Sequence, residues 1–161
     1  MKKLPTKIYK EVVKNTPIVS IDLVIKDANG KVLLGYRLNN PAEKMWFVPG
    51  GAILKNEPFK DAFKRITEDE LGIPLQLEDA TYIGLYEHIY KTNFTNNPDF
   101  GTHYIVNAFC IQLKQTNIKL PKDQHSRYWW ATKNEILTHK EVHQNTKNYF
   151  NNTPSFSNKK E

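Results

Sequence analysis

The hydrophobic positions of the chain repeat with two periods, and these periods predict helices and strands in a fixed order. Apolar residues at helical spacing predict amphipathic helices over residues 6–15 and 58–71, and further helices over 132–138 and 141–150. Runs of β-branched and aromatic residues predict strands at 18–26, 31–38, 80–90, 102–114 and 128–131. Strands that flank one strong central helix and precede closing helices indicate an α/β (α+β) domain with a mixed sheet.

Residues with special backbone preferences mark the ends of the central helix. Asn56 is expected to cap its N-terminus and Pro58 to occupy its first turn. Gly72 is expected to end it, because glycine readily adopts the left-handed conformation that closes a helix.

Length and composition fit one domain. The chain has 161 residues, of which 39% are hydrophobic and 25% are charged, so a packed core is possible. From residue 151 onward the composition resembles that of a tail. We therefore expect a single domain over residues 1–150 and a flexible C-terminal tail over residues 151–161.

The net charge of +6 does not indicate a nucleic-acid partner. The arginines are only Arg37, Arg65 and Arg127, and the other basic residues are lysines dispersed along the chain. A nucleic-acid binder is expected to gather its basic residues on one face. We therefore expect no nucleic-acid partner, and the three arginines become the informative cations.

The single cysteine and the length of the apolar runs indicate the cellular compartment in which the protein is expected. The single cysteine, Cys110, cannot form an internal disulfide, which fits a reducing compartment. No apolar run approaches the roughly 20 residues needed to span a bilayer. The basic N-terminus lacks the apolar segment of a secretory signal. The expectation is a cytoplasmic protein without a membrane partner.

The central helix places one carboxylate on its apolar face. Counted from Phe59 at about 100° per residue, the residues within about 60° are Ala62, Phe63 and Ile66. Glu70 falls at about 20°, in the middle of this stripe. An inward carboxylate is costly unless it is paired or binds a metal. The alternative is that the helix end frays, so that Glu70 meets water.

The spacing around this helix carries a motif. Gly51 is followed after five residues by Glu57, after a further seven by Arg65, and then by Glu70 and Gly72. This pattern resembles the Nudix box, a loop–helix motif written G-x5-E-x7-R-E-U-x-E-E-x-G-U, in which U is aliphatic. The resemblance implies a Nudix-type α/β/α sandwich, with a mixed sheet flanked by helices, that acts on a diphosphate.

The resemblance also assigns roles within the box. The backbone carbonyl of Gly50 and the carboxylate of Glu70 would bind Mg²⁺, with Mn²⁺ as an alternative, since such ions prefer oxygen ligands. Glu57 and Arg65 would pair and hold the loop against the helix. The structural positions of the box are Gly51, Glu57, Arg65 and Gly72.

The helix half of the box is incomplete. Ile66 stands where the box has glutamate, Thr67 where it has an aliphatic residue, and Asp69 where it has the first of two paired glutamates. Ile66 cannot bind a metal, and Asp69 is short and lies about 80° from the stripe. A site with several metals and a helix glutamate as base is therefore not expected. Either the protein binds without catalysis, or its base lies elsewhere.

Histidines are the candidates for a base outside the box. His125 lies in a polar loop, where a histidine is usually only exposed, although its ordinary pKa suits a general base near neutral pH. His139 and His143 stand four residues apart and form a second candidate, a metal-binding pair, but no third ligand accompanies them.

A closer resemblance is to the GDP-mannose mannosyl hydrolases, a Nudix subfamily with an incomplete box. The segments that carry it are 16–17, 46–51, 102–104 and 123–125. It implies hydrolysis of GDP-mannose, or a related GDP-hexose, to GDP and free sugar by attack of water at the anomeric carbon with inversion. It also implies a homodimer and one Mg²⁺ per active site, bound by Gly50, Glu70 and Gln124.

The same resemblance assigns the remaining site residues. His125 would deprotonate the water, Arg37 would contact the diphosphate and Asp22 would contact the substrate. The substrate-binding residues would be Tyr9, Arg37, His88, Tyr90 and Tyr104, with Tyr9 placed to stack on guanine. For Asp22 the alternative is an outward-facing strand position, and for the residues of the later strands it is ordinary packing within the sheet.

One departure from the subfamily keeps other functions open. Ala52 stands where the subfamily often has an arginine, and Lys55 is a candidate substitute for that cation. One alternative is a nucleoside-diphosphate-sugar pyrophosphatase, which cleaves the P–O–P link. The other is a catalytically silent module that binds nucleotide sugars.

Overall fold

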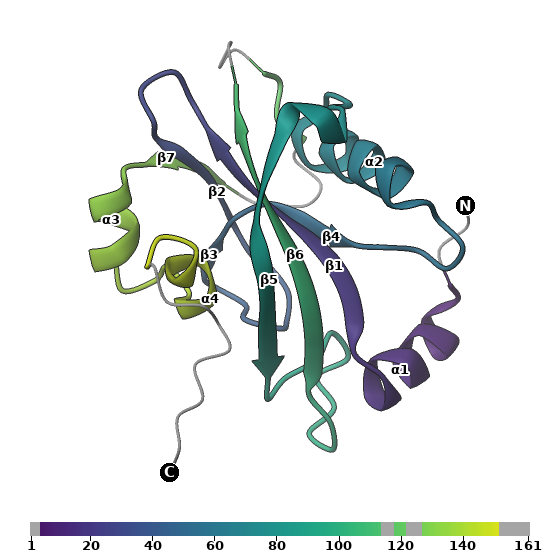
Figure 1. Cartoon of the computed structure of the whole chain (residues 1–161). Helices are drawn as coiled ribbons and strands as arrows, with labels where there is room; N and C mark the ends of the chain where they lie inside the picture. Colours follow the sequence, from purple (N-terminus) through teal and green to yellow (C-terminus); the bar gives the residue numbers. More distant parts are fainter. Residues whose placement is uncertain (1–3, 114–117, 122–126, 152–161) are drawn as a thin grey trace.

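The computed structural model describes residues 4–113, 118–121 and 127–151 (Figure 1). Its helices are α1 (Thr6–Asn15), α2 (Phe59–Leu71), α3 (Lys133–Thr138) and α4 (Gln144–Asn148), with a 3₁₀ turn η1 (Leu77–Asp79). Its strands are β1 (Ile18–Lys26), β2 (Val32–Tyr36), β3 (Trp46–Phe47), β4 (Gly50–Ala52), β5 (Ala80–Tyr90), β6 (Thr102–Gln112) and β7 (Tyr128–Ala131).

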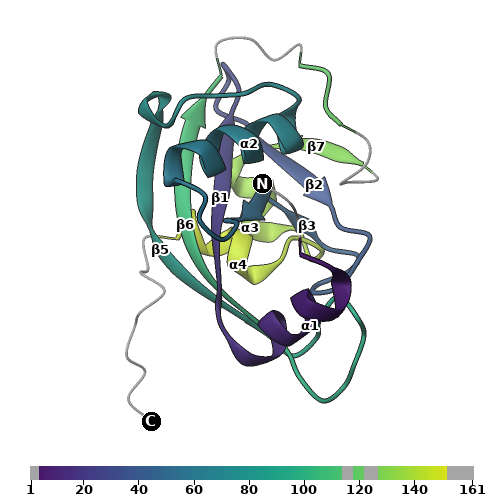
Figure 2. The ribbon, with the colours of Figure 1, turned by 90° about the vertical axis from the view of Figure 1, so that its right-hand side faces the viewer.

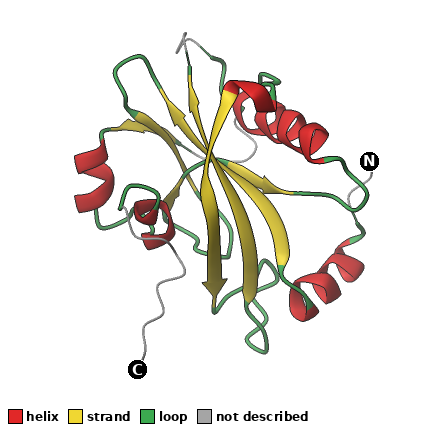
Figure 3. Cartoon of the chain, in the orientation of Figure 1, coloured by secondary structure: helices red, strands yellow, loops and turns green. Residues whose placement is uncertain are grey.

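One seven-stranded mixed sheet organises the fold (Figure 3). Its main order is β3-β2-β1-β6-β5, while β4 also pairs with β1 and β7 with β2. The central pair β1–β6 is parallel, and the other strand pairs are antiparallel. The mixed sheet expected from the sequence is therefore confirmed.

Helices cover both faces of this sheet, which gives the expected α/β/α sandwich. Helix α2 lies on one face, and α3 and α4 lie on the other (Figures 1 and 2). On the α2 side, Ile21 and Leu23 of β1 share a core with Phe63. On the opposite side, Val24 of β1 shares a core with Ile136 of α3. Strand β1 is therefore covered on both faces over most of its length, although Val19 near its start is exposed.

The C-terminus of α2 ends at the expected residue, but its N-terminus is not capped as expected. Gly72 ends the helix in the left-handed conformation, with φ of 73°, as expected. The expectation that Asn56 caps the N-terminus is wrong, because Pro58 takes the cap position and no side chain caps it. Asn56 instead adopts φ of 63° within the preceding loop, a conformation that asparagine tolerates better than most residues.

The last expected helix is shorter than its sequence pattern indicates. Residues 141–150 were expected to be helical, but α4 begins only at Gln144. The backbone of Trp46 donates to the carbonyl of Glu141 and accepts from the amide of His143, so this stretch is extended. Pairing with β3 therefore prevails over local helical propensity. The described helices include none that is long and apolar enough to cross a membrane.

Candidate functional site

A polar cavity of about 240 Å³ opens beside the middle of β1. Most of the residues singled out in the sequence meet there, although they come from widely separated elements. Those that line the cavity are Tyr9, Asp22, Arg37, Gly50, Gly51, Glu70, His88, Tyr90 and Tyr104. The predicted metal ligand Gln124 and the predicted base His125 lie outside the described residues.

Glu70 reaches this cavity from the apolar face of α2. Its exposed fraction is 6%, and the following residue, Leu71, is fully buried. The helix continues to Leu71 and ends at Gly72, so the alternative of a frayed end that exposes Glu70 to water is wrong. A carboxylate therefore stands at the cavity wall, where an ionised group needs a partner or a cation.

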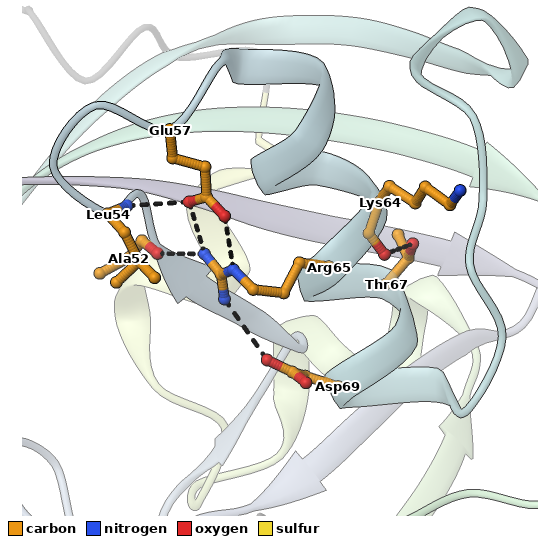
Figure 4. Close-up of polar contacts among 7 residues, drawn as sticks. All are labelled: Ala52, Leu54, Glu57, Lys64, Arg65, Thr67 and Asp69. Atoms are coloured by element: carbon orange, nitrogen blue, oxygen red, sulfur yellow. Dashed lines mark hydrogen bonds and ion pairs between the residues drawn. The ribbon is translucent and has the colours of Figure 1, made fainter. Parts of the chain in front are cut away.

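Arg65 and Glu57 lock the preceding loop onto α2 (Figure 4). Nε of Arg65 donates to Oε1 of Glu57 over 2.7 Å, and Nη2 donates to Oε2 over 2.8 Å. Nη2 also donates to the carbonyl of Ala52, and the amide of Leu54 donates to Glu57. The forked pair lowers the pKa of Glu57. The expected ion pair is thus present, and it fixes the loop beside the cavity.

The substituted box residues Ile66 and Asp69 line the adjoining groove, not the polar cavity. Asp69 is half exposed, and its Oδ2 lies 3.4 Å from Nη1 of Arg65. Ile66 is buried and packs against Gly51, where a Cβ atom would lie 3.1 Å from Cγ1 of Ile66. The structure describes all the carboxylates of α2, and among them Glu70 alone lines the polar cavity.

Asp22 places a second carboxylate in the cavity. The alternative of an outward-facing Asp22 is wrong, because its side chain lines the cavity and is hydrogen-bonded to Tyr149. The hydroxyl of Tyr149 donates a hydrogen bond of 2.6 Å to Oδ2 of Asp22. Burial raises the pKa of Asp22 to about 6, and the nearby Glu70 adds to the rise. The Tyr149 hydrogen bond and the charge of Arg37 act in the opposite direction.

Three residues of β5 and β6 form the aromatic wall of the cavity. His88 is buried, which lowers its pKa to about 4, and its Nε2 lies 3.3 Å from the hydroxyl of Tyr149. Burial raises the pKa of Tyr90 to about 12, although its hydroxyl accepts from Nδ2 of Asn145. Burial also raises the pKa of Tyr104. All three are uncharged near neutral pH, so the wall offers hydrogen bonds without net charge.

Arg37 brings the positive charge. It lies one residue beyond the end of β2, not within the strand as the sequence indicated. Its guanidinium stands 5.2 Å from the ring centroid of Phe47. No carboxylate within the described ranges is ion-paired with Arg37, so its charge is available to an anion in the cavity.

Tyr9 lines both the polar cavity and a second, more apolar groove of about 880 Å³. Its ring contacts that of Phe94 at 5.1 Å between centroids. The groove runs between α1, β4 and the box loop, and it shares Gly50, Gly51, Ala52 and Glu70 with the cavity. Lys55 lines the groove, not the polar cavity.

Two further residues belong to the site although no motif of the sequence indicates them. Ser20 lines the cavity, and its buried hydroxyl has no hydrogen-bond partner among the described residues. Its signal was its position two residues before Asp22, which places both side chains on one face of β1. Tyr149 had no local signal, because it lies 127 residues from Asp22.

The remaining candidates have structural roles in the described chain. Nδ1 of His139 accepts from the amide of Glu141, and Nδ1 of His143 accepts from the amide of Asn145. These bonds explain the two histidines without a metal. Arg127 stacks over the ring of Tyr36, with 4.2 Å from its guanidinium carbon to the ring centroid.

The donor set of the cavity fits a hard cation with few protein ligands. Within the described ranges, no three His, Cys, Asp or Glu side chains gather into a cluster that could hold a metal ion. The buried Glu70 carboxylate is a suitable oxygen donor for Mg²⁺, which usually keeps several waters and binds substrate phosphates through few carboxylates. The cavity residues therefore fit an ion that completes its coordination with ligands from solvent and substrate.

Comparisons with known proteins identify the family to which the chain belongs. The NUDIX domain family model matches residues 16–152. A curated relative, the "Low-salt glycan biosynthesis protein Agl8" of Haloferax volcanii, is 40% identical over 125 residues, which cover 78% of this chain and 77% of the relative.

Two solved structures share the fold. A MutT NUDIX hydrolase from Burkholderia pseudomallei matches with a TM-score of 0.67 and 24% identity, covering 84% of this chain and 96% of that one. A MutT protein from Methanosarcina mazei Go1 matches with a TM-score of 0.66 and 22% identity, covering 84% and 92%. From the family match, the relative and the shared fold together, the chain belongs to the Nudix hydrolase family.

Proposed function

We propose that this protein is a Mg²⁺-dependent hydrolase of a GDP-hexose, GDP-mannose or a close analogue, and that it releases GDP and free sugar. Water would attack the anomeric carbon with inversion, as in the GDP-mannose mannosyl hydrolases that the sequence resembles. The observation that carries the proposal is that Glu70 is the α2 carboxylate that lines the polar cavity, while Ile66 is buried against Gly51.

The family and the donor set of the cavity support a requirement for a divalent metal ion. Nudix hydrolases act on nucleoside diphosphate derivatives and generally use divalent ions such as Mg²⁺. We assign the Gly50 carbonyl, the Glu70 carboxylate and Gln124 as ligands of one ion. When bound, Mg²⁺ would neutralise negative charge on the diphosphate. Since this donor set holds one protein carboxylate, a single ion is expected.

The size of the cavity supports entry of only part of the substrate. Pockets for complete drug-sized ligands usually measure about 300–1,000 Å³, and this cavity measures about 240 Å³. The sugar and diphosphate would occupy the cavity, and the nucleoside would extend past Tyr9. The ring of Tyr9 and the adjoining apolar groove suit a flat base.

The charged groups of the cavity suit departure of a diphosphate. Arg37 would stabilise the negative charge that develops on GDP as the glycosidic bond breaks. Asp22 would contact the sugar, and His125 would remove the proton of the attacking water. The resemblance to a relative named for glycan biosynthesis supports a sugar nucleotide as substrate.

Hydrolysis in ¹⁸O-labelled water tests the bond that is cleaved. Attack at the anomeric carbon predicts GDP without label, which ³¹P NMR detects because ¹⁸O shifts the phosphorus resonance. Label in GDP would place the attack at phosphorus and overturn the proposal. A companion variant, His125→Ala, is expected to lower kcat by about 10²–10⁴-fold.

The same experiment separates the alternatives. A pyrophosphatase would release GMP and sugar phosphate, with label in one of them. A silent binding module would bind GDP-mannose with Mg²⁺ and release nothing over hours, a possibility that Ala52 motivates because it removes a cation beside the diphosphate. A panel of GDP-sugars would identify the preferred hexose.

We also propose that the protein is a homodimer. Light scattering coupled to size-exclusion chromatography measures its oligomeric state directly.

A further inference from the structure

We propose that Tyr149 is a positioning residue for Asp22, so that a segment near the C-terminus completes the site built by the Nudix box and the sheet. The inference deepens the proposed function, because hydrolysis of the GDP-hexose supplies one of its two readouts. Tyr149 does not line the cavity and so would act through Asp22. Its hydroxyl would fix the direction in which that carboxylate faces the substrate.

The two oxygens of Asp22 have different neighbours. Oδ2 accepts the 2.6 Å hydrogen bond from Tyr149, a distance typical of strong bonds from a hydroxyl to a carboxylate. Oδ1 lies against the backbone of Gly50, where a Cβ atom would stand only 2.6 Å away. The donor on one side and the backbone on the other together hold the carboxylate in one orientation.

The hydroxyl of Tyr149 is itself held in place. The ring of Tyr86 packs edge-on against that of Tyr149, with 4.7 Å between centroids. Nε2 of His88 lies 3.3 Å from the Tyr149 oxygen, which suits donation by His88 when the hydroxyl donates to Asp22. His88, Tyr149 and Asp22 thus form a row of hydrogen-bonded side chains that ends at the Asp22 carboxylate.

The segment that carries Tyr149 is attached to the cavity wall at two further points. The ring of His143 stacks on that of Phe47, with 4.7 Å between centroids. Nδ2 of Asn145 donates to the hydroxyl of Tyr90 over 3.0 Å. These contacts attach α4 and its N-cap residue to β3 and β5. Tyr149, which follows α4, therefore approaches Asp22 from a fixed direction.

Removal of this single hydroxyl should affect turnover more than binding. Without the donor, the Asp22 carboxylate gains rotational freedom beside the substrate, and small misplacements of an active-site group can cost about 10²-fold in rate. We expect Tyr149→Phe to lower kcat by about 10–10²-fold and to change KM less than threefold. Tyr86→Phe is the matched control. It removes a hydroxyl from the same aromatic cluster, but Tyr149 is the residue that donates to Asp22. This variant should therefore retain wild-type kcat.

A double-mutant cycle with Asp22→Ala decides between positioning and mere structural support. If Tyr149 acts through Asp22, Tyr149→Phe will cause no further loss of kcat in the Asp22→Ala background. Additive losses, an unchanged kcat in Tyr149→Phe, or an equal loss in Tyr86→Phe would each overturn the proposal.

A second readout keeps this inference separate from the proposed function. The same cycle is measured by urea unfolding, which needs no substrate. If the wild-type protein hydrolyses no GDP-hexose, the proposed function fails, and non-additive unfolding free energies still support the Tyr149–Asp22 interaction. Additive unfolding free energies would overturn the positioning role whether or not the protein is active.

Discussion

Gly50 and Asp22 are paired across β1 and β4 so closely that no side chain fits at Gly50. A Cβ atom there would lie 2.6 Å from Oδ1 of Asp22 and 2.6 Å from the carbonyl oxygen of Ile21. Neither neighbour can move freely, because one is backbone and the other is hydrogen-bonded to Tyr149. One wall of the cavity therefore requires glycine for steric reasons.

Gly50→Ala should accordingly impair activity together with stability. The added methyl group must displace the Asp22 carboxylate or the β1 backbone, so we expect a loss of kcat of about 10²-fold. Overpacking of this kind usually costs about 1–3 kcal/mol in the free energy of unfolding. Steady-state kinetics and urea unfolding measure the two effects. Gly30→Ala is the control, since its φ of 75° strains the variant while no atom within 4 Å would meet the new Cβ. It should lose stability and retain kcat.

Glu70→Gln should separate metal binding from folding. The substitution preserves the shape of the side chain and removes the charge, so the helix should form while the affinity for Mn²⁺ falls by about 10–100-fold or more. Electron paramagnetic resonance counts free Mn²⁺ directly. Asp69→Asn is the matched control on the same helix, because Asp69 is half exposed and does not line the polar cavity. Equal Mn²⁺ affinities in the two variants would argue against Glu70 as a ligand.

Arg65→Lys should destabilise the protein although it keeps the charge. Lysine cannot reproduce the forked contact with Glu57 or the bond to the Ala52 carbonyl, and Glu57 would remain buried with fewer donors. We expect the free energy of unfolding to fall by about 1–3 kcal/mol. Lys60→Gln provides the comparison, since it breaks an exposed ion pair with Glu78 and should leave stability essentially unchanged. Indistinguishable unfolding curves for Arg65→Lys and the wild type would contradict the structural role.

The pH dependence of stability should reveal two opposing groups. Burial lowers the pKa of His88 from 6.5 to about 4, so the unfolded chain takes up the proton first as the pH falls, and this group destabilises the fold between those values. Burial raises the pKa of Asp22 from 3.8 to about 6, so the folded chain takes up that proton first, and this group stabilises the fold as the pH falls. The two effects nearly cancel between pH 6 and pH 4.

His88→Gln should expose the contribution of Asp22 alone. In metal-free buffer, the unfolding free energy of this variant should increase relative to the wild type as the pH falls from 6 to 4. Asp22→Asn should show the opposite trend, because only the His88 contribution remains. Urea titrations at several pH values measure both. Parallel pH profiles for the wild type and both variants would refute the assigned titrations.

Local periodicity predicted most of the fold because short-range rules decide it. The bounds of α1 and of β5 agree with the expected ranges, and the inward direction of Glu70 followed from helical spacing alone. The exceptions have long-range causes. Residues 141–143 pair with Trp46, a contact that no local pattern encodes, and so α4 is shorter than expected.

The site was less predictable than the fold, because its parts come from distant segments. Asp22 was identified through a family resemblance, while its donor, Tyr149, is brought to it only by the folded sheet. Ser20 does not stand out in the sequence, because a serine in a strand is ordinary; only the structure shows that its buried hydroxyl has no hydrogen-bond partner among the described residues. The roles of Gln124 and His125 stay predictions, since both lie outside the described residues.

The separation of 127 residues between Asp22 and Tyr149 has a consequence for biosynthesis. At ribosomal rates of about 5–20 residues per second, Tyr149 is added roughly 6–25 s after Asp22. During that interval the nascent chain can contain β1 and the whole Nudix box and still lack the hydroxyl that binds the Asp22 carboxylate. The hydrogen bond between Tyr149 and Asp22 therefore forms only once synthesis has passed α4, and we expect the full rate of hydrolysis only from chains translated beyond that point.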